Sequence, residues 1–354
     1  MTSTWGLRLV AVMLLAVGCG DNIKPVSVDS GPVPDAGRSE VERGRYIMNT
    51  LGACTFCHTP LNPDGSRNLT KLFAGWSCSE TIPFLDVVPA AMDPGGNVGC
   101  LSSRNLTNHS TGLANATDQQ IKDAIRLGTR TDGKKLVPVM PYYIFHNMAD
   151  ADLDAIIAYL RTVPGVDNPI APNQEPWLSI NDGTTVATPI DPATIPMPAA
   201  GPDQASALRG RYLSSMVGLC IDCHTPEPAP VGNPPMPPLF PRPIDMTRPY
   251  AGGRMFPKEA LGLLDPSYPA VINVRNLTPH ATGLAGFTVP QIKAAIADGK
   301  DPMGNAVCAG THGSGISPYA ALDDQDLTDI ANYIASLPPI DSNTGANCAG
   351  PPVP

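Results

Sequence analysis

Two short segments of the chain combine cysteine and histidine at a spacing that suits one kind of chemistry. In each, two cysteines lie three positions apart and a histidine follows directly: Cys54, Cys57 and His58, and then Cys220, Cys223 and His224. Thiols at this spacing can add to the two vinyl groups of one haem while the imidazole binds the iron. A zinc site would need four ligands drawn together, and no further Cys-x-x-Cys or histidine pair adjoins either segment. The two motifs therefore predict two covalently bound haems c, with His58 and His224 as iron ligands.

The surroundings of the two motifs are repeated as well. Both motifs are preceded by Arg-Gly-Arg-Tyr and followed by Thr-Pro, and residues 104–125 match residues 275–296 without a gap. The apolar positions of a helix expected at 150–163 also match those of a helix expected at 324–336. A repeat of this length indicates a duplicated unit that holds one haem.

Helix signals surround the first motif. Ser39 and Glu42 form a capping box that predicts a helix over residues 39–51, which ends at the first motif. Thr117 and Gln120 form a second capping box, and Gly128 is expected to end that helix. The helix at 150–163 shows one apolar stripe, made by Leu153, Ile156, Ile157 and Leu160.

Together, these motifs and helices resemble the di-haem cytochromes c of bacterial envelopes, which consist of two class I cytochrome c domains in tandem. The resemblance covers residues 39–340 and implies an all-α fold with three main helices around each haem. It implies that the first and last helices of each domain cross where a glycine meets an aromatic residue, at Gly44 with Tyr159 and at Gly210 with Tyr333. The expected organisation is a signal peptide at 1–19, a flexible tether at 20–38, cytochrome c domains at 39–166 and 204–340, a proline-rich linker at 167–203 and a tail at 341–354.

The sixth iron ligand separates electron carriers from proteins with an open iron. The family pattern places a methionine in a Met-Pro-Tyr segment between helices, which Met140 matches in the first domain. In the second domain Ser314 stands at the corresponding position, and a serine hydroxyl is a poor ligand for haem iron. His312, in a glycine-rich loop, is the preferred ligand there. Met303 is the second candidate, and an open iron is the third possibility.

Arginines and histidines also recur at equivalent positions, and both repeats contain Asn-Leu-Thr triplets. Arg104 and Arg275 can pair with haem propionates by bidentate hydrogen bonds or form structural salt bridges. His109 and His280 are interpreted as surface or hydrogen-bonding histidines. The Asn-Leu-Thr triplets match glycosylation acceptors in form only, because the leader is of bacterial type: Asn68, Asn105 and Asn276.

Four of the other cysteines are divided equally between the repeats. They predict one disulfide within each domain, with free buried thiols as the alternative: Cys78 and Cys100 in the first, Cys308 and Cys348 in the second. Such disulfides require an oxidising compartment.

The N-terminus and the overall charge suggest where the protein works. Arg8 precedes an apolar run at 9–17 that is too short to span a bilayer and fits a secretory leader. Residues 16–19 resemble a lipoprotein cleavage box, which predicts a lipidated Cys19 and a membrane tether; plain secretion is the alternative. The net charge of -9 argues against nucleic acid as a partner.

These features predict an electron-transfer protein on the periplasmic side of the bacterial envelope. It would pass electrons from a dehydrogenase or quinol-linked donor to a terminal acceptor, because the haems carry the redox chemistry. Two alternatives remain: a di-haem peroxidase-like enzyme with an open second haem, and a cytochrome subunit of a larger dehydrogenase complex.

Overall fold

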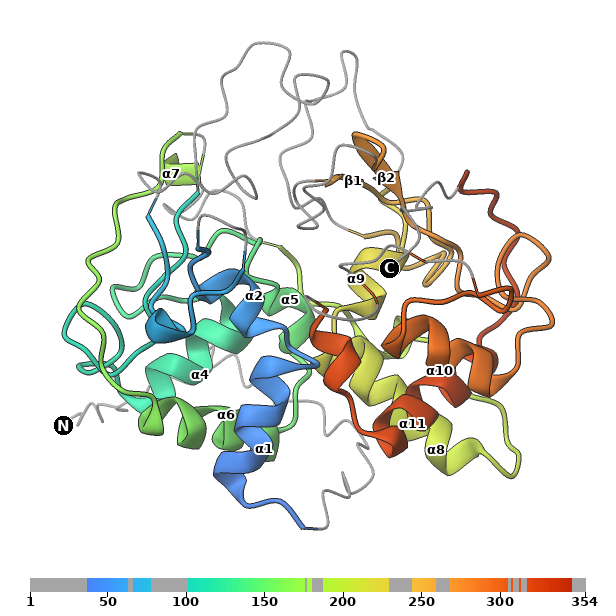
Figure 1. The fold of residues 1–354 in the computed structure, drawn as a ribbon, viewed down its shortest axis with the longest axis horizontal. Coiled ribbons are helices and arrows are strands. Elements are labelled where there is room, and N and C mark those ends of the chain that lie inside the picture. Colours follow the sequence, from blue (N-terminus) through green and yellow to red (C-terminus); the bar gives the residue numbers. More distant parts are fainter. Residues whose placement is uncertain are drawn as a thin grey trace, which may run out of the picture.

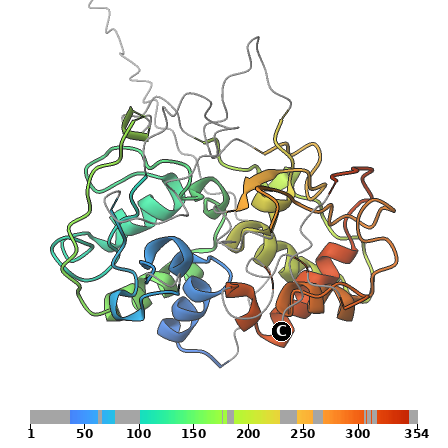
Figure 2. The ribbon, with the colours of Figure 1, turned by 45° about the horizontal axis from the view of Figure 1, so that its top comes forward.

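A computed structural model shows a helix-rich chain in which two sets of helices lie side by side (Figure 1). Figure 2, turned by 45°, shows the same separation of N-terminal (blue to green) and C-terminal (yellow to red) elements. The structure describes residues 37–62, 66–77, 101–175, 177–179, 187–228, 244–258, 268–304, 307, 312 and 317–345.

The N-terminal set consists of α1 (Glu40–Asn49), α2 (Cys54–His58), α4 (Asp118–Leu127), α5 (Tyr142–Phe145) and α6 (Asp150–Thr162). The C-terminal set consists of α8 (Gln204–Tyr212), α9 (Cys220–His224), α10 (Val289–Ala297) and α11 (Asp324–Ala335). Two short turns connect the sets along the chain: α7 (Trp177–Ser179) and the 3-10 turn η3 (Pro192–Thr194). The 3-10 turn η1 (Leu69–Lys71) belongs to the N-terminal set, and the π-helical segment η4 (Leu213–Val217) and the 3-10 turn η6 (Pro318–Ala321) belong to the C-terminal set.

The predicted helix starts are confirmed. The Ser39 hydroxyl accepts a hydrogen bond from the Glu42 main chain, and the Glu42 carboxylate accepts one from the Ser39 N–H. Thr117 and Gln120 form the same capping box at α4. That helix ends at Gly128, whose φ of 60° is the left-handed conformation that glycine adopts readily.

The first and last helices of each set cross at a glycine, as expected. A Cβ atom on Gly44 would overlap the carbonyl oxygen of Ala155, and one on Gly210 would overlap that of Asp329. The main chains of α1 and α6, and of α8 and α11, are therefore in direct contact.

The predicted aromatic residues lie one helical turn beyond these contacts. Tyr159 packs edge-on against Phe73 with the ring centroids 6.0 Å apart, and Tyr333 packs against Tyr250 in the same way at 5.8 Å. Each ring thus fixes its last helix against the loop that follows a cysteine–histidine motif.

The helix-rich structure is compatible with the predicted all-α fold, and the described residues add one short hairpin to the helices. Strands β1 (Met255–Pro257) and β2 (Val271–Asn273) pair antiparallel, with Phe256 opposite Ile272. Both of these side chains are buried, so the hairpin is anchored in the second half of the chain. Strands of three residues are too short to show a recognisable alternation of apolar and polar residues.

The two sets of helices share one hydrophobic core and exchange hydrogen bonds at their helix ends. The Tyr46 hydroxyl of α1 donates to Asp326 at 2.7 Å and accepts from the Asp323 N–H, the N-cap of α11. The Tyr212 hydroxyl of α8 donates to Asp152 at 2.7 Å and accepts from the Ala149 N–H, the N-cap of α6. Each set therefore caps the last helix of the other.

The proline-rich connection also packs against both sets, in the part that the structure describes. Trp177 is buried with Leu101 and Val137. Further along, the Ile190 N–H donates to the Tyr143 carbonyl at 3.0 Å. The buried Arg211 of α8 donates to main-chain carbonyls of the same connection, those of Pro192, Ile195 and Pro196.

Several predictions fall on residues outside the described part of the chain: Cys19, Cys78, Cys100, Ser314, Cys308 and Cys348. The lipid anchor and the disulfides therefore stay predictions. Within the described ranges, no helix combines the length and apolar character that crossing a bilayer requires.

Candidate haem sites

A cavity of about 420 Å³ lies next to the first motif. Cys54, Cys57, His58 and Met140 all line it. Much of the remaining wall is apolar and comes from α1, α4 and α6, including Ile47, Ile121, Ile125, Ile156 and Leu160. Pockets for cofactors are typically of roughly this size and apolar character. The residues therefore fit a haem: two thiols for attachment, one imidazole and one thioether face the same space.

A hydrogen bond to the main chain orients the ring of His58. Its Nδ1 donates to the Arg104 carbonyl at 2.8 Å, with the Ser103 hydroxyl 3.1 Å away. Such a hydrogen bond fixes the tautomer and leaves Nε2 available for a metal. Burial lowers the pKa of His58, opposed by the hydrogen bond to Arg104, so that the ring is held neutral.

A tight loop places the Arg104 carbonyl behind His58. Phe73 adopts a positive φ of 59°, and its N–H donates to the Thr59 hydroxyl at 3.1 Å. Two residues later the Gly75 N–H donates to the His58 carbonyl at 2.8 Å. A Cβ on Gly75, whose φ is 68°, would overlap the main chain at Arg104, so this position requires glycine.

The second motif is supported by the same arrangement. Nδ1 of His224 donates to the Arg275 carbonyl at 2.9 Å. Tyr250 has a φ of 62° and donates its N–H to the Thr225 hydroxyl at 3.1 Å, while the Gly252 N–H donates to the His224 carbonyl at 2.7 Å. The two motifs thus share a local structure as well as a sequence.

Arg104 and Arg275 therefore have a main-chain role that the sequence did not indicate. Their carbonyls orient His58 and His224. The side chain of Arg104 also lines the cavity, and burial lowers its pKa, with Arg130 acting in the same direction. Pairing of these guanidinium groups with propionates stays a prediction.

Met140 lines the same cavity as the attachment motif. Its N–H donates to the Val137 carbonyl at 3.1 Å, and its carbonyl accepts from the Tyr142 N–H at 2.7 Å. These two hydrogen bonds hold the loop before α5 in a tight turn. Met140 as an iron ligand stays a prediction.

The two candidates for the second iron differ in their positions. Met303 is 82% exposed, in a turn where its N–H donates to Asp301. His312 instead faces His224, with the ring centroids 6.1 Å apart and the planes at 44°. Burial lowers the pKa of His224 to about 3 and that of His312 to about 4, so both rings are neutral near pH 7.

A buried charge cluster at the second motif was missed by sequence reasoning. Arg254 is 1% exposed and forms an ion pair with Asp222, which lies inside the motif. The Tyr143 hydroxyl, from the first half of the chain, donates to the same carboxylate at 2.6 Å. The available signal was the difference between the motifs, because Asp222 replaces Phe56, and a partly buried carboxylate is stabilised by a cation.

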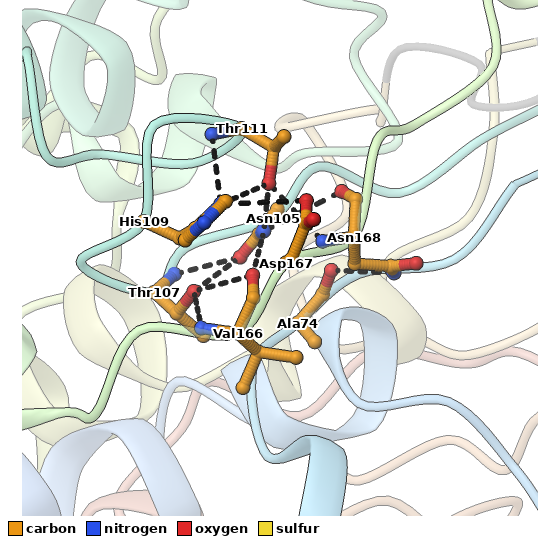
Figure 3. Close-up of polar contacts among 8 residues, drawn as sticks. All are labelled: Ala74, Asn105, Thr107, His109, Thr111, Val166, Asp167 and Asn168. Carbon is orange, nitrogen blue, oxygen red and sulfur yellow. Dashed lines mark hydrogen bonds and ion pairs between the residues drawn. The ribbon is translucent and has the colours of Figure 1, made fainter.

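The asparagine and histidine that follow Arg104 form a clamp rather than a binding site (Figure 3). Asn105 is 3% exposed; its amide donates to the Val166 carbonyl at 3.0 Å and its oxygen accepts from the Thr107 N–H. His109 contacts the Thr111 hydroxyl at 2.9 Å. The equivalent Asn276 and His280 repeat these contacts. The prediction that both histidines serve hydrogen bonding is confirmed, and the two buried asparagines cannot be glycosylation acceptors.

Two cysteine–histidine motifs, each with an imidazole oriented by a main-chain carbonyl, are typical of the c-type cytochrome class of site. The comparisons agree with this class, although no family model matches the chain. The chain is 30% identical over 225 residues to the fructose dehydrogenase cytochrome subunit of Gluconobacter japonicus, covering 62% of this chain and 40% of that protein.

Two further relatives extend the comparison. The chain is 26% identical over 328 residues to the cytochrome c subunit of a quinone alcohol dehydrogenase from Gluconacetobacter polyoxogenes, covering 88% of this chain and 59% of that protein. It is 30% identical over 132 residues to a di-haem c-type cytochrome of Cereibacter sphaeroides, covering 36% of this chain and 37% of that one. The chain spans about two-fifths to three-fifths of the length of the first two relatives. These relatives confirm the predicted resemblance to the di-haem cytochromes c.

Proposed function

We propose that the protein is an electron-transfer cytochrome that carries two covalently bound haems c. Cys54 and Cys57 attach the first haem and Cys220 and Cys223 the second. His58 and His224 bind the irons, and Met140 completes the first. When bound, each haem supplies one-electron redox chemistry, while the chain sets potential, spacing and docking.

The observation that carries this proposal is the closeness of the two motifs. Leu219, which directly precedes Cys220, lines the cavity of the first motif. Tyr143, three residues after Met140, donates a hydrogen bond to Asp222 inside the second motif. Two cofactors held this way are joined through packed protein, which suits transfer of electrons inside one molecule.

The relatives suggest the class of partner. The fructose and alcohol dehydrogenase relatives are named as cytochrome subunits of those enzymes. We therefore place this protein as the cytochrome component that accepts electrons from a dehydrogenase, on the periplasmic side of a bacterial envelope. The lipid tether at Cys19 belongs to the same proposal.

The peroxidase-like alternative is less well supported. Such an enzyme needs one iron with an open position for peroxide. The second motif is the candidate for that role, and there His312 faces His224 at the distance given above. A side chain in this place favours a carrier over an open site.

The test begins with haem attachment. The chain is expressed in a host that matures c-type cytochromes, and haem is counted by the pyridine haemochrome spectrum and by intact mass. Two adducts per chain are expected, and one in each of the double variants Cys54→Ala/Cys57→Ala and Cys220→Ala/Cys223→Ala, which serve as controls for each other. A chain that matures without haem contradicts the proposal.

The second step tests electron transfer. The purified protein is mixed with a flavin- or quinone-dependent dehydrogenase and its substrate, and haem reduction is followed in a stopped-flow spectrometer. Both haems are expected to be reduced through the protein partner and then reoxidised by an added acceptor. Rapid turnover of peroxide without a dehydrogenase would favour the enzyme instead.

A further inference from the structure

We infer that His312 is the sixth ligand of the second haem iron, so that this haem is held between two histidines while the first has histidine and methionine. The inference rests on the proposed function, because it requires a haem at the second motif. It concerns the group opposite His224 and therefore the chemical difference between the two haems.

The distance between the two rings fits a shared metal ion. Imidazole nitrogens bind metals at about 2 Å, and a ring centroid lies about 1.1 Å behind its nitrogen. Two imidazoles that bind one iron from opposite sides thus have ring centroids roughly 6.2 Å apart by this bond length. The observed separation of His224 and His312 is 6.1 Å. The tilt of 44° between the planes is permitted, because each ring can rotate about the axis through the metal.

The surroundings of His312 hold the ring in this place. It stacks on Tyr319 with the centroids 5.7 Å apart and the planes at 26°. The Tyr319 main chain is in turn held by a hydrogen bond from its N–H to the Ser317 hydroxyl at 3.2 Å. Stacking on Tyr319 therefore holds the His312 ring beside that of His224.

One atom of His312 also lacks a partner. Its Nδ1 is buried and makes no hydrogen bond with any residue in the described ranges. Buried polar atoms are normally satisfied, and an exception calls for an explanation. His224, by contrast, has its Nδ1 bonded to the Arg275 carbonyl. An imidazole beside a metal site with an unused nitrogen is suited to act as a ligand.

The competing ligand does not share these features. Met303 is 82% exposed and sits in a turn closed by Asp301. The choice of His312 has a redox consequence, because methionine ligation raises the potential of a haem relative to a second histidine. The second haem then has the lower potential, and electrons run from it to the first.

The test uses the mature protein after mass spectrometry has shown two haems per chain. The ferric protein is expected to show the near-infrared band of methionine-ligated haem at the intensity of one haem, and low-spin electron paramagnetic resonance signals of a haem with two imidazoles for the other. His312→Ala should make the second haem high-spin and able to bind one carbon monoxide per chain when reduced. Met303→Ala is the matched control and should change none of these spectra.

If the alanine variant does not mature, His312→Met provides a second test. It should give the second haem a methionine ligand and so double the intensity of the near-infrared band. The inference is overturned by a wild-type band at the intensity of two haems, by a wild-type high-spin haem, or by ligand loss in Met303→Ala. These results leave the proposed function standing. A protein without attached haem overturns the proposed function itself, so the two failures are distinguishable.

Discussion

At the scale of single residues, two threonines connect haem attachment to the shape of the loop behind it. Thr59 and Thr225 follow the histidines of the two motifs and are fully buried. Each hydroxyl accepts the N–H of an aromatic residue in a left-handed conformation, Phe73 or Tyr250. Residues other than glycine pay a steric penalty in this conformation, so these hydrogen bonds help to keep the loop in place.

Thr59→Val is expected to lower the free energy of unfolding by about 1–3 kcal/mol, because the buried N–H of Phe73 loses its acceptor. Thr225→Val should give a similar loss. The measurement is guanidinium denaturation of the mature protein followed by circular dichroism.

Thr162→Val, at an exposed position near the end of α6, is the control and should change the free energy by less than about 0.5 kcal/mol. Equal effects of the buried and exposed substitutions would show that the threonines do not support the loop.

At the scale of elements, the helix crossings decide how each last helix is placed. Gly44 lets the main chains of α1 and α6 touch, and α1 leads directly to the attachment motif. The orientation of the first haem site thus depends on a position without a side chain.

Gly44→Ala should force the two helices apart and lower the free energy of unfolding by about 3 kcal/mol or more, because the added Cβ meets main chain that cannot move aside. Thermal unfolding and the yield of haem attachment are the measurements. Gly201→Ala is the control, since nothing lies within 4 Å of the added carbon. If both variants retain wild-type stability, the crossing is not a close one.

Sequence reasoning predicted the elements whose signals are local. The capping boxes at Ser39 and Thr117 and the glycine at the end of α4 are read directly from neighbouring residues, and all are confirmed. The motifs themselves are equally local. The sixth ligand of the second iron could not be chosen from the sequence alone, because both His312 and Met303 lie near the expected position in the chain.

Features that depend on distant contacts were not predictable in this way. The Arg104 carbonyl that accepts the His58 hydrogen bond could not be predicted from the sequence, because every residue has a main-chain carbonyl. Nor does a tyrosine show in the sequence which helix end its hydroxyl will cap, as Tyr46 and Tyr212 illustrate. The shared hydrophobic core is such a feature as well, because its members come from both repeats.

At the scale of the whole molecule, the exchanged tyrosines make stability non-local. The Tyr212 hydroxyl, in the second repeat, bonds to Asp152 and to the N-cap of α6, both in the first repeat. Asp152 is also paired with Arg43 at 2.8 Å, and both side chains are buried. A substitution at Tyr212 in the second repeat is therefore expected to destabilise the first repeat.

Tyr212→Phe should speed hydrogen exchange in α6 more than in α8, because the lost hydroxyl leaves the Ala149 N–H and one oxygen of Asp152 without that partner. The free energy of unfolding is expected to fall by about 1–3 kcal/mol, as for other buried groups that lose a hydrogen-bond partner. Hydrogen exchange with mass spectrometry of peptides from both helices is the measurement.

Tyr159→Phe is the matched control, because it removes a tyrosine hydroxyl from α6 and keeps the ring that packs on Phe73. Faster exchange confined to α8 in Tyr212→Phe would contradict the exchanged cap.

The two haems should also differ as redox centres. A spectroelectrochemical titration of the mature protein is expected to show two separated reduction steps, the lower belonging to the haem with two histidines. Met140→His should move the upper step towards the lower one, whereas Met303→Ala should leave both in place. A single step of two electrons in the wild type would speak against different ligand sets.

The exchange of caps also bears on what happens when the chain is cut. A protease that cleaves between residues 187 and 203 would produce two fragments, each of which still holds the tyrosine that covers a helix start in the other. Such fragments should stay associated and keep their colour. A truncated gene that encodes one repeat alone would instead yield a polypeptide with an uncovered helix end and an exposed apolar face, a substrate for cellular quality control rather than a smaller working cytochrome.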